Sequence, residues 1–388
     1  MKLAKNLENL GTESAFSVLA EAKALEAKGH PMIHLGLGQP DFKTPKHVVE
    51  AAKKALDDGH HGYVMSNGIP ECREAVTRWI KKRYDANIDA ERILIMPGGK
   101  PTMSYAIQCF GEPGAEIIHP TPAFPIYESM INYTGSTPVP YDLTEDKDLK
   151  FDPDKILSLI TDKTRLLILI NPNNPTGSFV EKPVIDYFAK ELEKHPHVTI
   201  LSDEIYSRQI FDYKEMPSFF HYEALKDRLI VLEGWSKAYS MTGWRLGWSY
   251  WPKEMVAHVN KLLINSVSCV NAAAQFAGIA ALDGPDDSIN DMLDKFTLRR
   301  NLIHKGLNDL PGIECSLPGG AFYAFPKVKG TGMTGAEFCK KAMHEAGVAI
   351  VPGTAFGKTC QDYVRFSFAA SRDNIQQALE NIAKMLSK

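Results

Sequence analysis

Short runs of hydrophobic residues recur along this chain and alternate with segments of helical spacing. The runs lie at residues 93–96, 116–119, 166–170, 198–201, 229–232 and 246–251. Strands that are apolar on both faces and alternate with helices are typical of a mostly parallel sheet covered by helices on both sides. The pattern therefore predicts an α/β fold whose ligand lies at the carboxyl ends of the strands.

Three helices are predicted before the first of these runs. Residues 15–27 have helical apolar spacing, residues 45–56 form a second helix, and Pro70 begins a third that reaches about Tyr84. Between the first two helices, the segment 35–42 holds two glycines beside a proline. Such a segment is either backbone exposed to a ligand or a simple bend.

Composition narrows the class of protein. The chain has 388 residues, a net charge of −3 and 44% hydrophobic residues, which is typical of a soluble protein with one large and one small domain or with two or three domains. This charge argues against nucleic acid as a partner. Residues 1–10 lack the apolar core of a signal peptide, and no stretch of about 18 apolar residues could cross a bilayer, so we expect a cytoplasmic protein and no membrane contact.

Cysteines and histidines give no pattern of metal ligands. The six cysteines are widely spaced and form no CxxC pair, which suits free thiols in a reducing compartment. The pairs His60-His61 and His195-Pro196-His197 have no cysteine or carboxylate at useful spacing, and we interpret them as turn or surface histidines. No metal is expected.

Residues that are suited to catalysis or to ligand binding follow the apolar runs. The segment Pro97-Gly98-Gly99-Lys100-Pro101 comes directly after residues 93–96 and predicts a helix start, which is either an anion site or a plain connection. Phe124 follows the run at 116–119 and either stacks on a flat cofactor or belongs to the core. The asparagine-rich segment 171–177 follows the next run and is either an elaborate turn or a fixed set of amide groups.

An acid and a lysine follow the next two runs. Asp203 follows Ser202 after the run 198–201 and either needs a cationic partner at the sheet edge or caps a helix. Lys237 lies in the stretch 234–247, which also holds Ser236 and Arg245. Its amine either reaches water or has a lowered pKa and attacks a carbonyl, of a substrate or of pyridoxal phosphate.

Together these residues are what a pyridoxal phosphate pocket needs. Five motifs, in the same order along the chain as in a known family, carry a resemblance to that family. The motifs are Gly38-Gln39-Pro40-Asp41-Phe42, Asn174-Pro175-Thr176-Gly177, Ser202-Asp203-Glu204-Ile205-Tyr206, Ser236-Lys237 with Arg245 eight residues on, and Val364-Arg365-Phe366-Ser367. The chain resembles a class I aminotransferase of pyridoxal phosphate fold type I, near the branch of bacterial and archaeal aspartate aminotransferases. The resemblance covers nearly the whole chain.

The resemblance implies roles for the residues that hold the cofactor ring. Lys237 resembles the Schiff-base lysine that also carries the catalytic proton, and Asp203 resembles the partner of the pyridine nitrogen. Tyr206 and Asn174 resemble the residues that bind the phenolic oxygen of the ring, and Phe124 resembles the ring that stacks on the pyridine face.

The resemblance also implies residues for the phosphate and for the substrate. The groups matched to the phosphate within one subunit are Ser236, Arg245 and the backbone at Gly99 and Lys100. Tyr63 resembles a tyrosine that reaches the phosphate of the neighbouring subunit. This match implies a homodimer. Arg365 resembles the arginine that binds the substrate α-carboxylate, assisted by Gly38 and Asn174. Without the resemblance, Arg365 would be interpreted as a surface charge.

The chain departs from the family pattern at three places. Position 234 is glycine where some relatives have a serine, so we expect Ser236 to make more of the phosphate contact. Pro101 has no N–H, which leaves Gly99, Lys100 and Thr102 as donors. Asn174 is assigned to the ring because it stands directly before Pro175-Thr176-Gly177.

The resemblance implies a large domain with a seven-stranded sheet and a smaller α+β domain. The large, cofactor-binding domain is expected at 46–285, and the small domain combines the N-terminal segment 1–45 with residues 286–388. Helix-like residues 294–307 and 374–386 and strand-like residues 321–325 suit the small domain. Its closure over a substrate would bring Arg365 and Gly38 toward Lys237.

The expected activity is a ping-pong transfer of an amino group from an L-amino acid to a 2-oxo acid such as 2-oxoglutarate. Aspartate is the first candidate donor, and aromatic amino acids or alanine come next. No motif marks a second arginine for a distal carboxylate, which counts against aspartate. The alternatives are a pyridoxal phosphate-dependent β-lyase that acts on cysteine conjugates and a non-catalytic binding protein that kept the fold.

Overall fold

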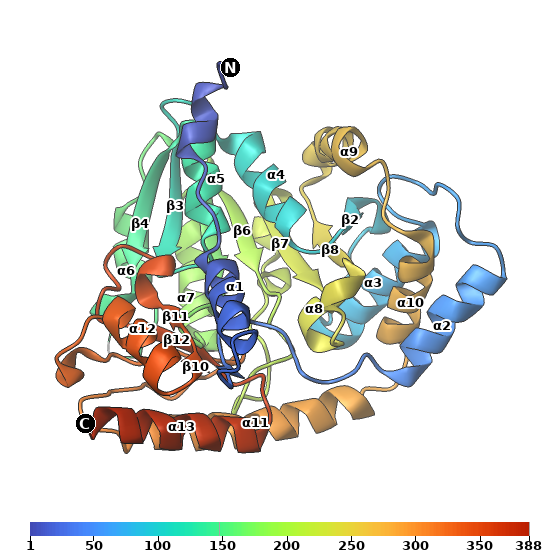
Figure 1. The fold of residues 1–388 in the computed structure, drawn as a ribbon. Helices are drawn as coiled ribbons and strands as arrows, with labels where there is room; N and C mark the ends of the chain where they lie inside the picture. The colour runs from blue at the N-terminus through green and yellow to red at the C-terminus, as the bar shows by residue number, and fades with distance from the viewer. Residues whose placement is uncertain (147, 388) are drawn as a thin grey trace.

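Each apolar run of the sequence forms a strand of one central sheet in the computed structural model of the protein, which describes residues 1–146 and 148–387. Helices cover the sheet, and a smaller part of the chain packs at one end of it (Figure 1). The strands are β1 (Ile33–His34), β2 (Ile93–Met96), β3 (Glu116–Thr121), β4 (Thr137–Asp142), β5 (Thr164–Ile170), β6 (Thr199–Asp203), β7 (Leu229–Gly234), β8 (Gly247–Tyr250), β9 (Tyr323–Ala324), β10 (Val348–Ala349), β11 (Val351–Pro352) and β12 (Val364–Ser367).

The helices include two long ones, α11 and α13, that run side by side along the lower edge of Figure 1. The α-helices are α1 (Ser14–Glu26), α2 (Lys46–Asp57), α3 (Pro70–Tyr84), α4 (Lys100–Phe110), α5 (Ile126–Thr134), α6 (Pro153–Ser158), α7 (Lys182–Leu192), α8 (Trp235–Ala238), α9 (Lys253–Val267), α10 (Ala272–Asp283), α11 (Asp287–Asn308), α12 (Gly335–Glu345) and α13 (Arg372–Leu386). Of the helices in the described part of the chain, none is both long and apolar enough to cross a membrane.

The central sheet has the strand order β2-β8-β7-β6-β5-β3-β4. Strand β8 pairs antiparallel with β2 and β7, and the other pairs are parallel. The predicted α/β fold with a mostly parallel seven-stranded sheet is therefore confirmed. Because β5, β6 and β7 are parallel neighbours, Ile170, Asp203 and Gly234 all lie at the same edge of the sheet.

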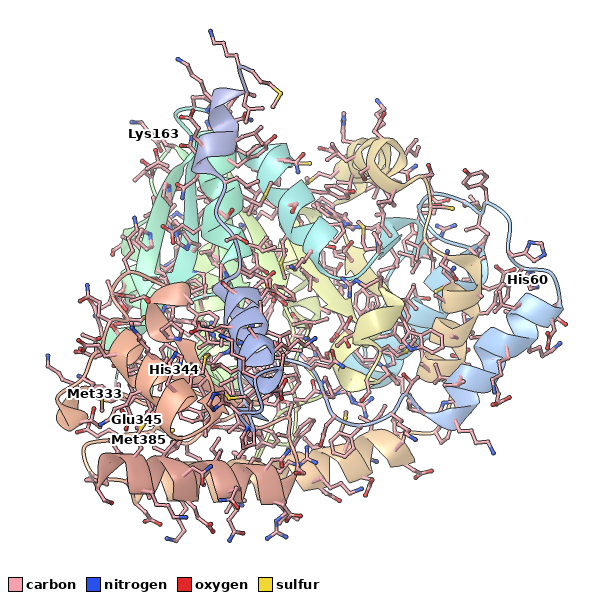
Figure 2. The ribbon with its side chains drawn as sticks, in the orientation of Figure 1. His60, Lys163, Met333, His344, Glu345 and Met385 are labelled. Atoms are coloured by element: carbon pink, nitrogen blue, oxygen red, sulfur yellow. The ribbon has the colours of Figure 1, made fainter. Side chains whose placement is uncertain are left out.

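Side chains fill the space on both faces of this sheet (Figure 2). Along β2, Leu94 and Met96 pack with α4 in one hydrophobic cluster, whereas Ile93 and Ile95 pack with α3, α7 and α10 in another. Alternate residues of a strand point to opposite faces, so a strand buried on both sides is apolar throughout. This two-sided burial explains why the runs were visible in the sequence.

The smaller part combines segments from both ends of the sequence. Strand β1 pairs in parallel with β10, and β9, β12 and β11 form a separate antiparallel sheet. Helices α11, α12 and α13 lie beside these strands (Figure 1). The arrangement agrees with the expected small domain, while the boundaries at residues 45 and 285 stay a prediction.

Candidate active site

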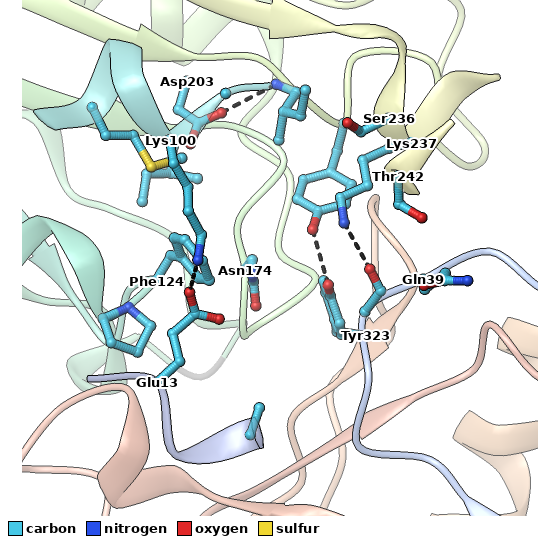
Figure 3. A pocket seen from close by; sticks show the side chains of 18 of the residues that line it. Glu13, Gln39, Lys100, Phe124, Asn174, Asp203, Ser236, Lys237, Thr242 and Tyr323 are labelled. Atoms are coloured by element: carbon cyan, nitrogen blue, oxygen red, sulfur yellow. Dashed lines mark hydrogen bonds and ion pairs between the residues drawn. The ribbon is translucent and has the colours of Figure 1, made fainter. Parts of the chain in front are cut away.

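A cavity of about 540 Å³ opens at the carboxyl ends of β5, β6 and β7 (Figure 3). All the candidate site residues from the sequence line it except Tyr63. They are Gly38, Gly99, Lys100, Phe124, Asn174, Asp203, Tyr206, Ser236, Lys237, Arg245 and Arg365. Residues from seven separate segments of the chain therefore meet at one place, although the role of each stays a prediction.

Lys237 projects into the cavity from the short helix α8, which begins directly after β7. Its Nζ donates a hydrogen bond of 2.6 Å to the carbonyl oxygen of Gly38. Burial, together with the nearby charges of Arg365 and Arg245, lowers the pKa of Lys237 to about 8. A lysine that loses its proton this easily has a larger fraction of neutral, nucleophilic amine near neutral pH than an exposed lysine.

Asp203 ends β6 and is almost fully buried. No helix begins there: its Oδ2 accepts a 2.6 Å hydrogen bond from the Tyr127 hydroxyl, and its Oδ1 accepts one of 3.2 Å from the Ile205 N–H. Burial raises the pKa of Asp203 to about 6, while these hydrogen bonds oppose the rise. A carboxylate held in this way favours a cationic group beside it in the cavity.

Two tyrosines line the cavity beside Lys237 and Gly38. The hydroxyl groups of Tyr206 and Tyr323 lie 2.9 Å apart and share a hydrogen bond. Gly38 packs tightly against this pair, because a Cβ at that position would lie 1.9 Å from the Tyr323 Oη. The position therefore requires glycine for close approach rather than for a turn.

Positive groups gather at the start of α4. Gly98 has a φ of +86°, and a Cβ there would lie 2.2 Å from an Nη atom of Arg245, so the guanidinium rests against this glycine. The Thr102 N–H already donates to the Gly99 carbonyl. A guanidinium beside the unpaired N–H groups of a helix start is a favourable site for a phosphate.

Arg365 is buried at the opposite wall. It donates from Nη1 to the Asn174 Oδ1 at 2.9 Å and from Nη2 to the Gly36 carbonyl at 2.6 Å. Its guanidinium lies 4.5 Å from the ring centroids of both Tyr323 and Phe356, and its Nε has no partner in the described chain. The arginine is thus rigidly held and able to bind a carboxylate.

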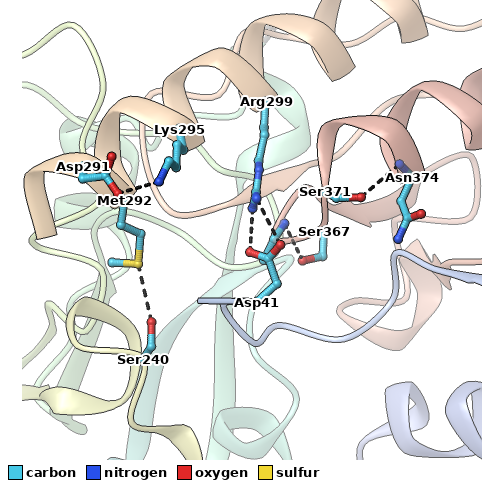
Figure 4. Close-up of polar contacts among 10 residues, drawn as sticks. Asp41, Ser240, Asp291, Met292, Lys295, Arg299, Ser367, Ser371 and Asn374 are labelled. Atoms are coloured by element: carbon cyan, nitrogen blue, oxygen red, sulfur yellow. Dashed lines mark hydrogen bonds and ion pairs between the residues drawn. The ribbon is translucent and has the colours of Figure 1, made fainter. Parts of the chain in front are cut away.

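The N-terminal segment is fixed to the small part of the molecule by Asp41. Its carboxylate accepts two hydrogen bonds from Arg299 of α11, at 2.6 and 3.0 Å (Figure 4). The Leu35 carbonyl also accepts from the Ser367 N–H at 2.7 Å. These contacts place Gly38 and Arg365 on the same structural unit.

Two further residues predicted from the sequence are Lys100, which lines the cavity, and Tyr63, which does not. The Lys100 ammonium makes an ion pair with Glu13 and lies 5.6 Å from the centroid of the Phe124 ring. Tyr63 has a side chain that is 92% exposed and lies outside the cavity. Its expected contact with a neighbouring subunit stays a prediction.

Sequence reasoning missed three polar residues of the site: Glu13, Tyr127 and Tyr323. Tyr127 lies in the first turn of α5, three residues after Phe124, so its nearness to that candidate residue was a usable signal. Tyr323 lies in the expected strand-like stretch 321–325, where an aromatic residue is ordinary. Glu13 comes before the first predicted helix, and nothing in its surroundings marks it.

Comparisons with known proteins agree on one family. The sequence profile described as "Aminotransferase class I and II" matches residues 30–382. An aspartate aminotransferase from Pyrococcus horikoshii is 36% identical over 365 residues, covering 93% of this chain and 92% of that protein. An aspartate aminotransferase from Bacillus subtilis is 32% identical over 394 residues, covering 100% of both chains.

Solved structures show the same fold. The aspartate aminotransferase from Rhizobium meliloti superposes with a TM-score of 0.94 at 31% identity, covering 100% of this chain and 99% of that one. An alanine aminotransferase from Pyrococcus furiosus gives 0.93 at 32% identity and covers 100% of both chains. Proteins named for two different amino acids are therefore similar to this chain over its whole length.

Proposed function

The chain belongs to the class I and II aminotransferases and is a pyridoxal phosphate-dependent aminotransferase, and we propose that its cavity transfers an amino group from an L-amino acid to a 2-oxo acid by a ping-pong cycle. The observation that carries this proposal is the position of Lys237. A partly buried lysine with a lowered pKa shares one cavity with a buried carboxylate and a buried arginine. These are the groups that the reaction requires.

The cavity residues fit pyridoxal phosphate. Asp203 is a buried carboxylate that favours a cation, which a protonated pyridine nitrogen would supply. Arg245, Ser236 and the start of α4 would hold the phosphate, Phe124 would lie against the ring, and Asn174 and Tyr206 would bind its phenolic oxygen. When bound, the cofactor accepts electrons from the substrate Cα and so stabilises the charge that develops there.

The protein's own residues have separate tasks in the reaction. Lys237 would hold the cofactor and, once released, carry the proton to and from the substrate Cα. Arg365 would bind the α-carboxylate with two parallel hydrogen bonds, for which the Asn174 and Gly36 contacts keep it oriented. The Tyr206 and Tyr323 pair would exclude water from the lysine side of the cavity.

The proposed substrates follow from the relatives and from the pocket. Aspartate is the first candidate donor because several similar proteins carry that name, and alanine or aromatic amino acids follow. The proposed acceptor is 2-oxoglutarate. The proposed assembly is a homodimer in which Tyr63 reaches the phosphate of the other subunit, and the cytoplasmic location also stays a prediction.

Absorbance spectroscopy of wild type and Lys237→Ala tests the proposal. Each protein is loaded with pyridoxal phosphate, and aspartate, alanine and phenylalanine are added one at a time. An active donor should shift the visible band of the wild-type protein toward the near ultraviolet, whereas Lys237→Ala should not complete the shift. Lys163→Ala, at an exposed lysine on the surface, is the control and should behave as wild type (Figure 2).

Product analysis separates the alternatives. A β-lyase would release pyruvate and ammonia from a cysteine conjugate without any added 2-oxo acid, whereas a transaminase needs the second substrate to turn over. A binding protein that kept the fold would show no lysine-dependent visible band at all. That last result would reject the proposed role of Lys237.

A further inference from the structure

The charged groups that line the cavity leave one ion pair without a task in the proposed function. The cations are Lys100, Lys237, Arg245 and Arg365, and the carboxylates are Glu13 and Asp203. The ring, the phosphate and the α-carboxylate account for four of these groups. Only Glu13 and Lys100 then remain to meet the side chain of the substrate.

The position of Glu13 makes this pairing notable. Glu13 is the N-cap residue of α1, a position at which the shorter side chains of Ser, Thr, Asp and Asn commonly accept a hydrogen bond from the first turn of the helix. Its side chain makes no such capping bond and instead pairs with Lys100. The side chain of Glu13 is 14% exposed and that of Lys100 is 44% exposed, so the carboxylate is the more enclosed partner.

Lys100 presents its ammonium between aromatic rings. Its Nζ lies 5.6 Å from the centroid of Phe124 and 5.9 Å from that of Phe16. Figure 3 shows Lys100 and Glu13 meeting beside Phe124, away from Lys237. The carboxylate of Glu13 is thus paired with Lys100, the cation of the cavity that is left to bind a second carboxylate of a substrate.

We propose that Glu13 determines which class of substrate side chain the cavity accepts, by acting as a built-in counter-ion that dicarboxylic substrates must displace from Lys100. An uncharged side chain, apolar or aromatic, leaves the ion pair in place and contacts Phe16 and Phe124. A dicarboxylic substrate reaches Lys100 only when Glu13 moves away. This inference rests on the proposed function, because it assumes that Arg365 binds the α-carboxylate.

The charge of Glu13 acts on Lys237 and Arg365, two groups of the proposed reaction. Burial dominates the lowered pKa of both Lys237 and Arg365, and the charge of Glu13 opposes the lowering in each case. A carboxylate that acts on both residues is close enough to compete with a substrate anion in the same cavity. Such a device would let one pocket bind charged and uncharged substrate side chains in turn.

Calorimetric binding to the cofactor-loaded protein tests the competition without any reaction. Succinate has two carboxylates and no amino group, and 3-phenylpropionate has one carboxylate and an aromatic ring. Glu13→Gln should bind succinate roughly tenfold more tightly than wild type, as expected for a freed, partly buried cation. Its affinity for 3-phenylpropionate should change less than about twofold.

A matched variant controls for the change in net charge. Glu8→Gln removes the same charge from an exposed position in the same N-terminal segment and should leave both affinities unchanged. If Glu13→Gln leaves succinate binding unchanged, or strengthens both ligands equally, Glu13 does not compete for a distal carboxylate and the inference is overturned.

A second variant tests the route through Lys100. In a Lys100→Met background, Glu13→Gln should no longer strengthen succinate binding, because the cation that both carboxylates share is gone. An undiminished effect of Glu13→Gln in that background would also overturn the inference. Thermal unfolding of each variant shows whether it is folded.

The proposed function has its own readout in the same proteins. If alanine and phenylalanine shift the visible band of wild type but Glu13→Gln does not change the affinity for succinate, only the inference about Glu13 fails. If no amino acid shifts the band of wild type, the proposed function fails, whatever the binding results.

Discussion

Gly38 shows how much of the site depends on a single missing side chain. A Cβ at this position would lie 1.9 Å from the Tyr323 Oη and 3.0 Å from its Cζ. The Gly38 carbonyl is also the acceptor for Lys237. Any larger residue here must move the tyrosine, the backbone or both, and each of these positions a group of the proposed site.

We expect Gly38→Ala to lower the free energy of unfolding by about 1–3 kcal/mol, because the added methyl group overpacks a buried contact. Chemical denaturation measures this loss. Gly11→Ala, where a Cβ would have only ordinary contacts at 3.5 Å, is the control and should cost much less. Tyr323→Phe removes the closest atom, so the double variant should lose less stability than the two single variants together.

Residue types alone predicted the residues proposed to react, but not the neighbouring residues that form hydrogen bonds or ion pairs with the site. Lys237 and Asp203 were noticed because a charge directly after a buried strand is costly unless it is used. Tyr127 and Tyr323 carry no such cost, and they reach the site only through the fold. Glu13 pairs with Lys100 across most of the N-terminal third of the chain, a contact that no local pattern specifies.

Two further buried acids, Glu204 directly after β6 and Glu233 in β7, lie close to the site in the sequence and have no role in the proposed reaction. Glu204 follows β6 and accepts hydrogen bonds from the Ser202 hydroxyl and the Phe219 N–H, at 2.9 and 3.2 Å. Glu233 lies in β7 and is bound by the Ser207 hydroxyl and the Gly234 N–H. Burial raises the pKa of Glu204 to about 7 and that of Glu233 to about 8.

These acids predict a stability that falls as pH rises. The folded state holds protons on both groups above pH 4.5, where the unfolded chain releases them, so their stabilising contribution is lost as pH rises through about 7 to 8. Glu204→Gln and Glu233→Gln should therefore reduce the slope of unfolding free energy between about pH 5 and 8. Urea unfolding at several pH values measures the slope.

The control for this experiment is Glu254→Gln, a change at an exposed position in the first turn of α9. It should leave the slope as in wild type. A wild-type stability that rises from pH 5 to pH 8, with the same slope in both buried variants, would contradict the prediction.

At the scale of elements, strands buried on both faces were the most predictable. The run 93–96 coincides with β2, and the other five runs overlap β3, β5, β6, β7 and β8. Strand β4 was missed because it lies at the edge of the sheet, contains two prolines and is largely accessible to solvent. Its sequence therefore lacks the continuous apolar signal of a central strand.

At the scale of the whole molecule, the exposed side chain of Tyr63 bears on how subunits combine. If it completes the site of a partner subunit, a mixed dimer of Tyr63→Phe and Lys237→Ala subunits contains one site with both native residues. Such mixed dimers should regain about half of the wild-type activity per dimer. Co-expression with two affinity tags isolates them for a transamination assay at limiting cofactor.

The two homodimers are the controls for this complementation. Lys237→Ala should be inactive, and Tyr63→Phe should be active only at higher cofactor concentration. A mixed dimer no more active than the Tyr63→Phe homodimer at limiting cofactor would place the tyrosine outside the partner's site.

The layout of the domains could not be predicted from local patterns. Periodicity identified the strands and helices, but it could not show that segments from opposite ends of the sequence form one small unit. That expectation came only from the resemblance to the family. The pairing of β1 with β10 and the Asp41 contact with α11 are the interactions that now support it.

The pairing of β1 with β10 also has a consequence for synthesis of the chain on the ribosome. Ile33 and Val348 are partners, yet they are separated by more than 300 residues. At about 5–20 residues per second, the first strand waits roughly 15–60 seconds for its neighbour to be translated. The nascent N-terminal segment therefore emerges long before its own docking surface.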